Sequence, residues 1–256
     1  MKFRPCIDIH NGKVKQIVGG SLKDKGDTAS ENFVSERSAG YYGELFRQKG
    51  LDGGHIIILN SKESEYYEAS REQAFEALSA YPGGMQVGGG INADNAAEYI
   101  ERGASHVIVT SYVFYDGHID YERMEKLVKA VGRERLVLDL SCRKTDMGYN
   151  IVTDRWQNIS NEKITLELLN RLSEYCDEFL VHAVDVEGKN SGIERELVTL
   201  LSEYEKTPVT YAGGVHSLED IALIGALGKS RIDVTVGSAL DIYGGKLGID
   251  DIIAAI

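Results

Sequence analysis

The sequence has few of the residues that mark secreted, metal-binding or membrane-spanning proteins. Its three cysteines, Cys6, Cys142 and Cys176, are scattered and odd in number, so they form no metal-binding spacing and are typical of reduced thiols in the cytosol. No apolar run approaches the roughly 18 residues that a membrane helix needs. The first residues read as a strand and not as an apolar signal region. We therefore expect a cytoplasmic protein without a metal centre.

Positive charge is also scarce. Lysine and arginine together number 28 against 40 aspartates and glutamates, which gives a formal net charge of -12. A strongly acidic protein repels nucleic acid and anionic membranes, so we expect neither as a partner. A phosphorylated ligand would be repelled as well. Backbone N–H groups would then have to hold it locally.

Proline is rare, and its positions are informative. Pro5, Pro82 and Pro208 each stand at or just before an expected strand start, where the missing N–H does little harm. No linker or low-complexity segment divides the chain. We expect a single domain over residues 1–256 and a monomer.

Short β-rich runs alternate with amphipathic stretches along the whole chain. Strands are expected near Phe3–Ile9, His55–Asn60, Met85–Gly88, His106–Thr110, Arg135–Leu140, Glu178–Val184, Val209–Ala212 and Arg231–Val236. Helices are expected near Ala39–Lys49, Glu65–Ser79, Ala93–Arg102, Tyr121–Val131, Glu162–Tyr175, Glu194–Glu205, Leu218–Leu227 and Ile249–Ala255. Strict strand–helix alternation with near-continuous apolar strands predicts a parallel sheet. The repeat count and the length predict an α/β fold, a (β/α)8 TIM barrel.

Two long connections interrupt this pattern. They cover Gly12–Ser38 and Cys142–Asn161, and both follow strands at the face where barrel active sites form. Connections of this length are often functional, so we expect loops that close over a ligand.

An internal repeat divides the barrel into two halves. Val-Gly-Gly-Gly-Ile from Val87 leads, some twenty residues later, to Val-Thr-Ser at Ser111, and Tyr-Ala-Gly-Gly-Val from Tyr211 leads to Val-Gly-Ser at Ser238. The repeat extends to Asp8 in Cys-Ile-Asp-Ile and Asp139 in Val-Leu-Asp-Leu. The sequence thus predicts two half-barrel repeats. The plainer alternative is that the glycines merely end strands.

The repeated glycines suit a phosphate ligand. Glycine lets the backbone approach a ligand closely, and the following helix adds its positive N-terminal end. A lone glycine pair is weak support, but two matched copies are stronger. We expect one cradle from Gly89, Gly90, Asn92, Thr110 and Ser111, and a second from Gly213, Gly214, Gly237 and Ser238. Ser217, three residues before Asp220, is better explained as a helix cap.

The two aspartates are the candidate proton carriers. A carboxylate inside an apolar strand is costly unless it is paired or functional. Asp8 and Asp139 end strands one and five, which lie opposite one another in an eight-fold ring. A ligand that bridges the cradles would lie between them, so one carboxyl could remove a proton while the other donates one. The alternative is a structural ion pair at the barrel mouth.

Several stretches together resemble one family. Pro-Cys-Ile-Asp-Ile-His-Asn-Gly-Lys-Val-Lys-Gln-Ile-Val-Gly-Gly from Pro5 resembles the ProFAR (phosphoribosylformimino-5-aminoimidazole carboxamide ribotide) isomerases of histidine biosynthesis, especially the fungal and plant branch. Four further stretches agree, at Gly53, Gln86, Val181 and Tyr211. The resemblance covers essentially the whole chain. It implies a (β/α)8 fold, no metal, no cofactor and an Amadori rearrangement of a bisphosphorylated aminoimidazole carboxamide ribonucleotide.

The resemblance also implies residue roles. Asp8 matches the family's base, Asp139 its acid, and Trp156 a tryptophan that can stack on the aminoimidazole. Arg143 is either a phosphate ligand or a solvated side chain, and Trp156 is alternatively an ordinary packed indole.

An acid must keep its proton near neutral pH. We therefore expect apolar surroundings for Asp139 from Val137, Leu138 and Leu140. Asp8 is expected to stay ionised, helped by His10 or Lys15.

Three departures from the common bacterial pattern affect the expected site. Asn92 replaces an arginine, Ala183 a threonine and Asn60 an acidic residue. His182, Asp185 and Glu187 stand near Ala183 and are candidates to replace the lost substrate contacts. His182 is equally well explained as a buried histidine whose hydrogen bonds are satisfied.

Two other functions compete with the isomerase. The cyclase subunit of imidazole glycerol phosphate synthase shares the repeat and both aspartates, but it typically carries lysine where this chain has His10. It also needs a glutaminase partner. A non-catalytic phosphate-binding or scaffolding barrel is the second alternative, and loss of either aspartate would favour it.

Overall fold

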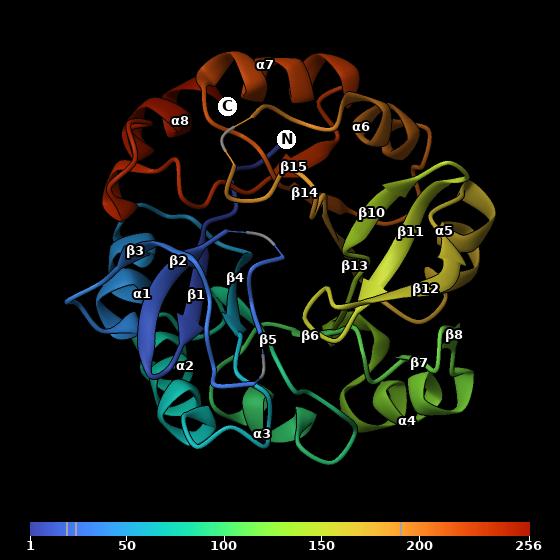
Figure 1. Cartoon of the computed structure of the whole chain (residues 1–256), viewed down its shortest axis with the longest axis horizontal. Coiled ribbons are helices and arrows are strands. Elements are labelled where there is room, and N and C mark those ends of the chain that lie inside the picture. The colour runs from blue at the N-terminus through green and yellow to red at the C-terminus, as the bar shows by residue number, and fades with distance from the viewer. Residues whose placement is uncertain (19, 24, 190) are drawn as a thin grey trace.

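A closed ring of parallel strands surrounded by helices forms the centre of the protein (Figure 1). The computed structural model describes residues 1–18, 20–23, 25–189 and 191–256. In ring order the barrel strands are β1 (Cys6–His10), β4 (Gly54–Ile58), β5 (Met85–Gly88), β6 (Val107–Val109), β9 (Leu136–Asp139), β13 (Glu178–His182), β14 (Val209–Ala212) and β15 (Ile232–Val234). Phe3 pairs in parallel with Val234 and closes the ring. The predicted (β/α)8 barrel is therefore confirmed.

Helices follow the barrel strands and cover the outside of the ring (Figure 1). They are α1 (Ala39–Gln48), α2 (Tyr67–Ala80), α3 (Ala96–Glu101), α4 (Tyr121–Val131), α5 (Leu166–Leu172), α6 (Arg195–Ser202), α7 (Leu218–Leu227) and α8 (Ile249–Ala255), with 3-10 turns at Arg133–Arg135 and Asp241–Tyr243. The Ser217 hydroxyl accepts a hydrogen bond from the Asp220 amide at 3.3 Å, so the predicted cap of α7 is confirmed.

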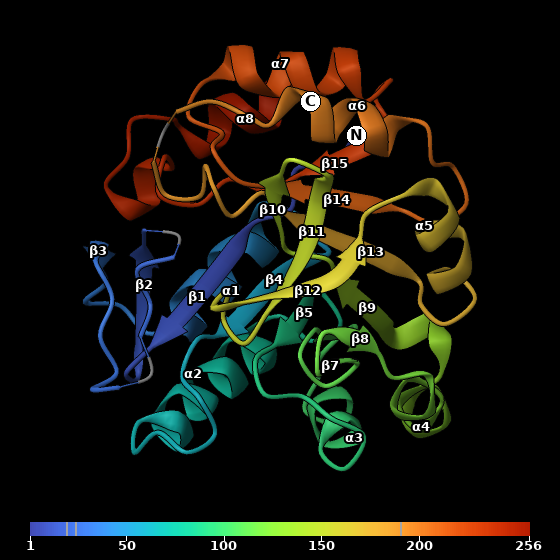
Figure 2. The same ribbon diagram turned by 45° about the vertical axis from the view of Figure 1, so that its right-hand side comes forward.

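The sequence suggested simple loops for the long connections after β1 and β9, but both connections contain strands. The first contains β2 (Lys13–Ile17) and β3 (Glu31–Val34), which extend the barrel sheet in antiparallel fashion. The second folds into an antiparallel sheet of β10 (Cys142–Thr145), β11 (Gly148–Thr153) and β12 (Asn158–Lys163). These two additions stand on opposite sides of the barrel (Figures 1 and 2).

Two shorter details also differ from the expected elements. A small hairpin of β7 (Phe114–Tyr115) and β8 (His118–Ile119) follows β6. The helix expected from Glu162 begins only at Leu166, because Glu162 belongs to β12 and Thr165 caps α5 by accepting from the Leu168 amide at 3.1 Å.

The inside of the barrel is filled by side chains from alternate strand positions. Ile108, Val137, Leu180 and Ala212 pack together there. Leu138 and Leu140 point outward and belong to the core between strands and helices. Of the three apolar residues expected around Asp139, only Val137 thus lies on its side of the strand.

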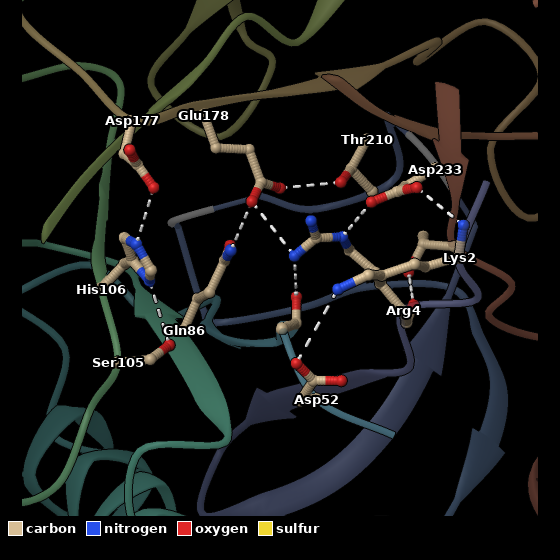
Figure 3. A network of polar contacts seen from close by, with 12 residues as sticks. Lys2, Arg4, Asp52, Gln86, Ser105, His106, Asp177, Glu178, Thr210 and Asp233 are labelled. Carbon is tan, nitrogen blue, oxygen red and sulfur yellow. Dashed lines mark hydrogen bonds and ion pairs between the residues drawn. The ribbon is translucent and has the colours of Figure 1, made fainter. Parts of the chain in front are cut away.

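A buried polar network fills the other end of the barrel (Figure 3). The Arg4 guanidinium contacts Asp233 at 2.7 Å and Glu178 at 3.1 Å. Glu178 also accepts from the Thr210 hydroxyl at 2.7 Å and from the Gln86 amide at 2.9 Å. Because each carboxylate is paired, the charges can stay buried. Arg4 stands four residues before Asp8 in the chain, so this network closes the end opposite to the carboxyl ends of the strands.

Candidate active site

The two predicted aspartates face one cavity. Asp8 in β1 and Asp139 at the end of β9 both line a cavity of about 390 Å³ at the carboxyl ends of the strands. The strands are opposite in the ring order, as the sequence predicted. Six other expected residues line the same cavity: Gly89, Gly90, Thr110, Ser111, Trp156 and His182.

A second, narrow cavity adjoins the first. It is lined by the four expected residues Gly213, Gly214, Gly237 and Ser238. Asp8, His182 and Glu187 line both cavities and therefore connect them. We call Gly89, Gly90, Thr110 and Ser111 the first cradle, and Gly213, Gly214, Gly237 and Ser238 the second cradle.

The two glycine pairs have matching backbone geometry. The φ angles are 106° and 69° at Gly89 and Gly90, and 118° and 76° at Gly213 and Gly214. A methyl group on Gly89 would collide with the Ile58 carbonyl oxygen, and one on Gly213 would lie 2.7 Å from the Ala183 carbonyl oxygen. Both turns therefore require glycine for its left-handed backbone and for the close approach of the preceding strand. The half-barrel repeat is thus present in three dimensions.

Asp139 is held by several hydrogen bonds. One carboxylate oxygen accepts from the Ser141 amide and hydroxyl, both at 2.7 Å, and the other accepts from the Thr110 hydroxyl at 3.0 Å. Three donors from two segments therefore fix the orientation of the carboxyl group. Hydroxyl and amide donors, and not the expected side chains of Leu138 and Leu140, thus surround this carboxyl group.

Asp8 lies in more desolvating surroundings. Burial raises the pKa of its carboxyl to about 7, opposed only by a long hydrogen bond of 3.4 Å from the Gln16 amide. The expected help from His10 and Lys15 is absent among the described residues. Lys15 pairs with Glu31 at 2.6 Å, and neither ring nitrogen of the buried His10 has a hydrogen-bond partner. Asp8 is therefore close to half-ionised near neutral pH.

Three further titratable groups lie beside Asp8. Burial and the nearby Asp8 raise the pKa of the Glu187 carboxyl to about 8. His182 Nε2 lies 3.9 Å from a Glu187 oxygen, and burial lowers the pKa of His182. The His55 ring packs edge-on against His182 at 6.0 Å, and burial lowers the pKa of His55 to about 3. The centre of the site thus favours neutral side chains.

Trp156 enters the cavity from the turn between β11 and β12. Its ring lies 5.7 Å from that of His182, and its Nε1 donates to the Ser141 hydroxyl at 3.0 Å. Asp154, Arg155 and Trp156 all have positive φ angles, of 51°, 56° and 69°. Such a run is strained in residues other than glycine and often accompanies function. The Asp154 amide donates to Ser111 at 2.8 Å, which ties the turn to the first cradle.

Three expected site residues line neither cavity. The Asn92 side-chain oxygen accepts from the amides of Asp94 and Asn95 at 3.0 and 3.2 Å, so it stabilises the turn before α3. Arg143 Nε lies 4.0 Å from Asp185, whose carboxylate also accepts from the Lys144 amide at 3.0 Å.

Sequence reasoning missed several residues of the first cavity. Lys62, Glu63, Tyr112 and Arg155 line it without having been singled out, and Glu187 had been considered only as a compensating residue. Each of these residues follows a strand end or lies in a connection. Their position relative to the strands was therefore the only sequence feature that could have identified them as cavity residues. Asn60 also lines the cavity, and it exchanges hydrogen bonds with Asn11 at 2.7 and 2.8 Å that fix the turn after β1.

Among the helices of the described residues, none has the length and apolar character to cross a membrane.

Comparisons with known proteins agree with this geometry. A relative from Medicago truncatula, named as a chloroplastic 1-(5-phosphoribosyl)-5-((5-phosphoribosylamino)methylideneamino)imidazole-4-carboxamide isomerase, is 56% identical over 258 residues, which cover 99% of this chain and 81% of the relative. Relatives with the same isomerase name from Yarrowia lipolytica and Saccharomyces cerevisiae are 44% and 42% identical, over 95% and 96% of this chain and 93% and 94% of their own lengths. The model of the family described as "Histidine biosynthesis protein" matches residues 2–247. The chain therefore belongs to this family of histidine biosynthesis proteins.

Proposed function

We propose that this protein is the aldose–ketose isomerase that converts ProFAR to its ketose isomer, PRFAR, in histidine biosynthesis. The isomerase name is shared by the plant and fungal relatives, which match nearly the whole chain. The observation that carries the proposal is the pairing of Asp8 and Asp139 across one cavity with a glycine cradle on each side. This arrangement suits a substrate that bears a phosphate at each end.

The reaction is an Amadori rearrangement. An acid protonates the ribose ring oxygen while the lone pair of the anomeric nitrogen forms a Schiff base. A base then removes the C2 proton, and the enolamine becomes the ketose when C1 takes up a proton and the C2 hydroxyl loses one. We assign Asp8 as the base and Asp139 as the acid by resemblance to the family. A base whose pKa lies near 7, as for Asp8, is well matched to proton abstraction near neutral pH.

Asp139 takes its proton with the substrate present. A bound substrate excludes water, which raises the cost of two charged carboxyl groups in one cavity. Ser141 and Thr110 orient the carboxyl group in either state.

The other contacts follow from the cavity. The first and second cradles bind the two phosphates through backbone N–H groups and the hydroxyls of Thr110, Ser111 and Ser238. Trp156 stacks on the aminoimidazole ring. Arg143 and Asp185 line neither cavity, so we assign them no direct contact with the substrate.

The remaining expectations are also proposals. We infer that residues 1–256 work as one monomeric barrel domain whose only partner is the bisphosphorylated substrate, without nucleic acid, membrane or cofactor. We place the protein in the cytoplasm, although the name of the Medicago relative assigns that protein to the chloroplast.

The test is an assay of the purified protein with ProFAR alone. We expect the protein to convert ProFAR to the ketose without any added protein. The absorbance of the ketose measures this conversion. Failure to convert ProFAR, combined with formation of an imidazole product from the ketose and ammonia, would identify the protein as a cyclase instead.

A further inference from the structure

The two cradles share one backbone geometry but differ in charge. The first cavity is lined by the cationic residues Lys62 and Arg155. No lysine or arginine lines the second cavity within the described part of the chain, and the carboxyl groups of Asp8 and Glu187 line both cavities. The first cavity is also lined by the carboxyl groups of Glu63, Asp139 and Asp154, so the position of a cation at the cradle itself decides the phosphate affinity.

Lys62 lies directly beside the first cradle. A methyl group placed on Gly90 would lie 3.0 Å from Lys62 Cε and 3.2 Å from its Cγ, so the lysine stem crosses the glycine turn. The side chain is exposed, and it makes no hydrogen bond or ion pair with any described residue. Its ammonium group is thus available to a ligand at this turn.

Asn92 cannot supply a cation here. Its side chain is neutral and already accepts from two backbone amides. The protein as a whole carries a net charge of -12, which opposes a phosphate dianion at long range. A cation near the cradle therefore contributes both a charge-assisted hydrogen bond and a local change of potential.

We propose that Lys62 is the phosphate-binding cation of the first cradle, and that it makes this cradle the tighter of the two phosphate subsites. This inference rests on the proposed function. It makes Lys62 a substrate-positioning residue that never transfers a proton. The second cradle then binds its phosphate through backbone amides and the Ser238 hydroxyl, close to Glu187.

The experiment compares wild type with Lys62→Met, Lys62→Arg and the control Lys129→Met. Lys129 is exposed on α4, outside both cavities, and its replacement makes the same change in net charge. We expect Lys62→Met to raise KM for ProFAR roughly 10-fold to 100-fold, the effect of losing one charge-assisted hydrogen bond, and to change kcat by less than about 3-fold. Lys62→Arg should recover most of the affinity, and Lys129→Met should behave as wild type.

A binding measurement tests the role of Lys62 separately from the proposed reaction. The fluorescence of Trp156 reports the binding of orthophosphate and of ribose 5-phosphate. A lower affinity of Lys62→Met for these phosphates supports the proposed subsite. If no variant isomerises ProFAR, the proposed function fails but this support for the subsite remains. Affinity and KM unchanged in Lys62→Met, in an enzyme that still isomerises ProFAR, would overturn the inference and assign the phosphate to backbone amides alone.

Salt dependence gives an independent readout. The dependence of phosphate affinity on ionic strength should be weaker in Lys62→Met than in wild type and Lys129→Met, because a screened attraction has been removed. Identical salt dependence in all three proteins would contradict the proposal.

Discussion

Asp8 and Asp139 face the same cavity from opposite strands, yet only Asp139 is held by several hydrogen bonds. Asp139 accepts three of them, at 2.7, 2.7 and 3.0 Å, whereas Asp8 accepts one at 3.4 Å. Two carboxyl groups in a pseudo-symmetric barrel are therefore placed in different electrostatic environments. Such a difference is what an acid–base pair needs in order to divide its tasks.

The pH dependence of the reaction should report Asp8. Because burial raises the pKa of its carboxyl to about 7, the fraction that can accept a proton increases through neutrality. We expect kcat/KM to rise with pH between about 6 and 8. A profile that is flat over this range would show that Asp8 is not the base or is fully ionised in the free enzyme.

The same group should affect stability. The pKa of Asp8 is raised above its ordinary value of 3.8, so its contribution to stability is fully present below about pH 4 and is lost as pH rises through about 7. Asp8→Asn should therefore be more stable than wild type at pH 8, by roughly 1–3 kcal/mol, and nearly equal to it at pH 4. Urea unfolding at both pH values measures this difference. Equal stability at pH 8 would contradict the assigned burial cost.

Trp156 should contribute to binding through its flat ring. Trp156→Ala is expected to weaken product affinity by roughly 1–3 kcal/mol, the usual loss for a base stacked on an aromatic side chain. Trp156→Phe keeps a ring but loses the hydrogen bond to Ser141, which in turn donates to Asp139. If stacking dominates, the phenylalanine variant retains most of the affinity.

Titration of wild type with product provides the matching spectroscopic test. Trp156 is the only tryptophan, so any change in tryptophan fluorescence reports this site. An unchanged spectrum at saturating product would place the indole outside the binding site.

The glycine turn of the first cradle can be tested against a matched glycine. Gly89 and Gly148 have similar φ angles of 106° and 112°, but a methyl group collides with Ile58 only at Gly89 and meets nothing within 4 Å at Gly148. Gly148→Ala should cost about 1 kcal/mol from backbone strain alone. Gly89→Ala should cost clearly more and should also weaken phosphate binding. Equal losses of stability and phosphate affinity in both variants would argue against the cradle.

The barrel was predictable from the sequence because each unit carries a strong local pattern. The bounds of α4, α7 and α8 agree with the expected ranges. The first two helices end at Gly132 and Gly228, and α8 begins after Gly248. The strands of β10 to β12 were not predictable in this way. Asn158–Lys163 reads Asn-Ile-Ser-Asn-Glu-Lys, a polar stretch whose strand state depends on pairing with β11 and not on its own hydrophobicity.

The site was predictable to the extent that strand ends determine it. Asp139 and both glycine pairs stand at such ends, Asp8 stands two residues before the end of β1, and all of them line the cavities. Lys62 and Glu187 lie in the connections after β4 and β13, whose paths no local pattern determines. The electrostatics of Asp8 depend on its burial and on the Gln16 amide, and β2 brings Gln16 to Asp8 only in the folded protein.

The additions after β1 and β9 should become more protected when ligand binds. The expectation of closing loops now applies to the segments of residues 13–34 and 142–163, which the structure places at the two sides of the cavity. Closure would exclude water from the Schiff base. Hydrogen exchange of peptides from both segments should slow with bound product, while peptides of α4 serve as the control. Exchange rates that do not respond to product would contradict closure.

The most direct test of the central claim is single-turnover kinetics of folded Asp8→Asn and Asp139→Asn with ProFAR. Each substitution keeps the size of the side chain but removes proton transfer. The account predicts that the rate of the chemical step falls at least ~100-fold in each variant, with substrate affinity largely kept. A near wild-type rate in either variant would contradict the assignment of that aspartate, and Glu187 would become the next candidate for the proton carrier.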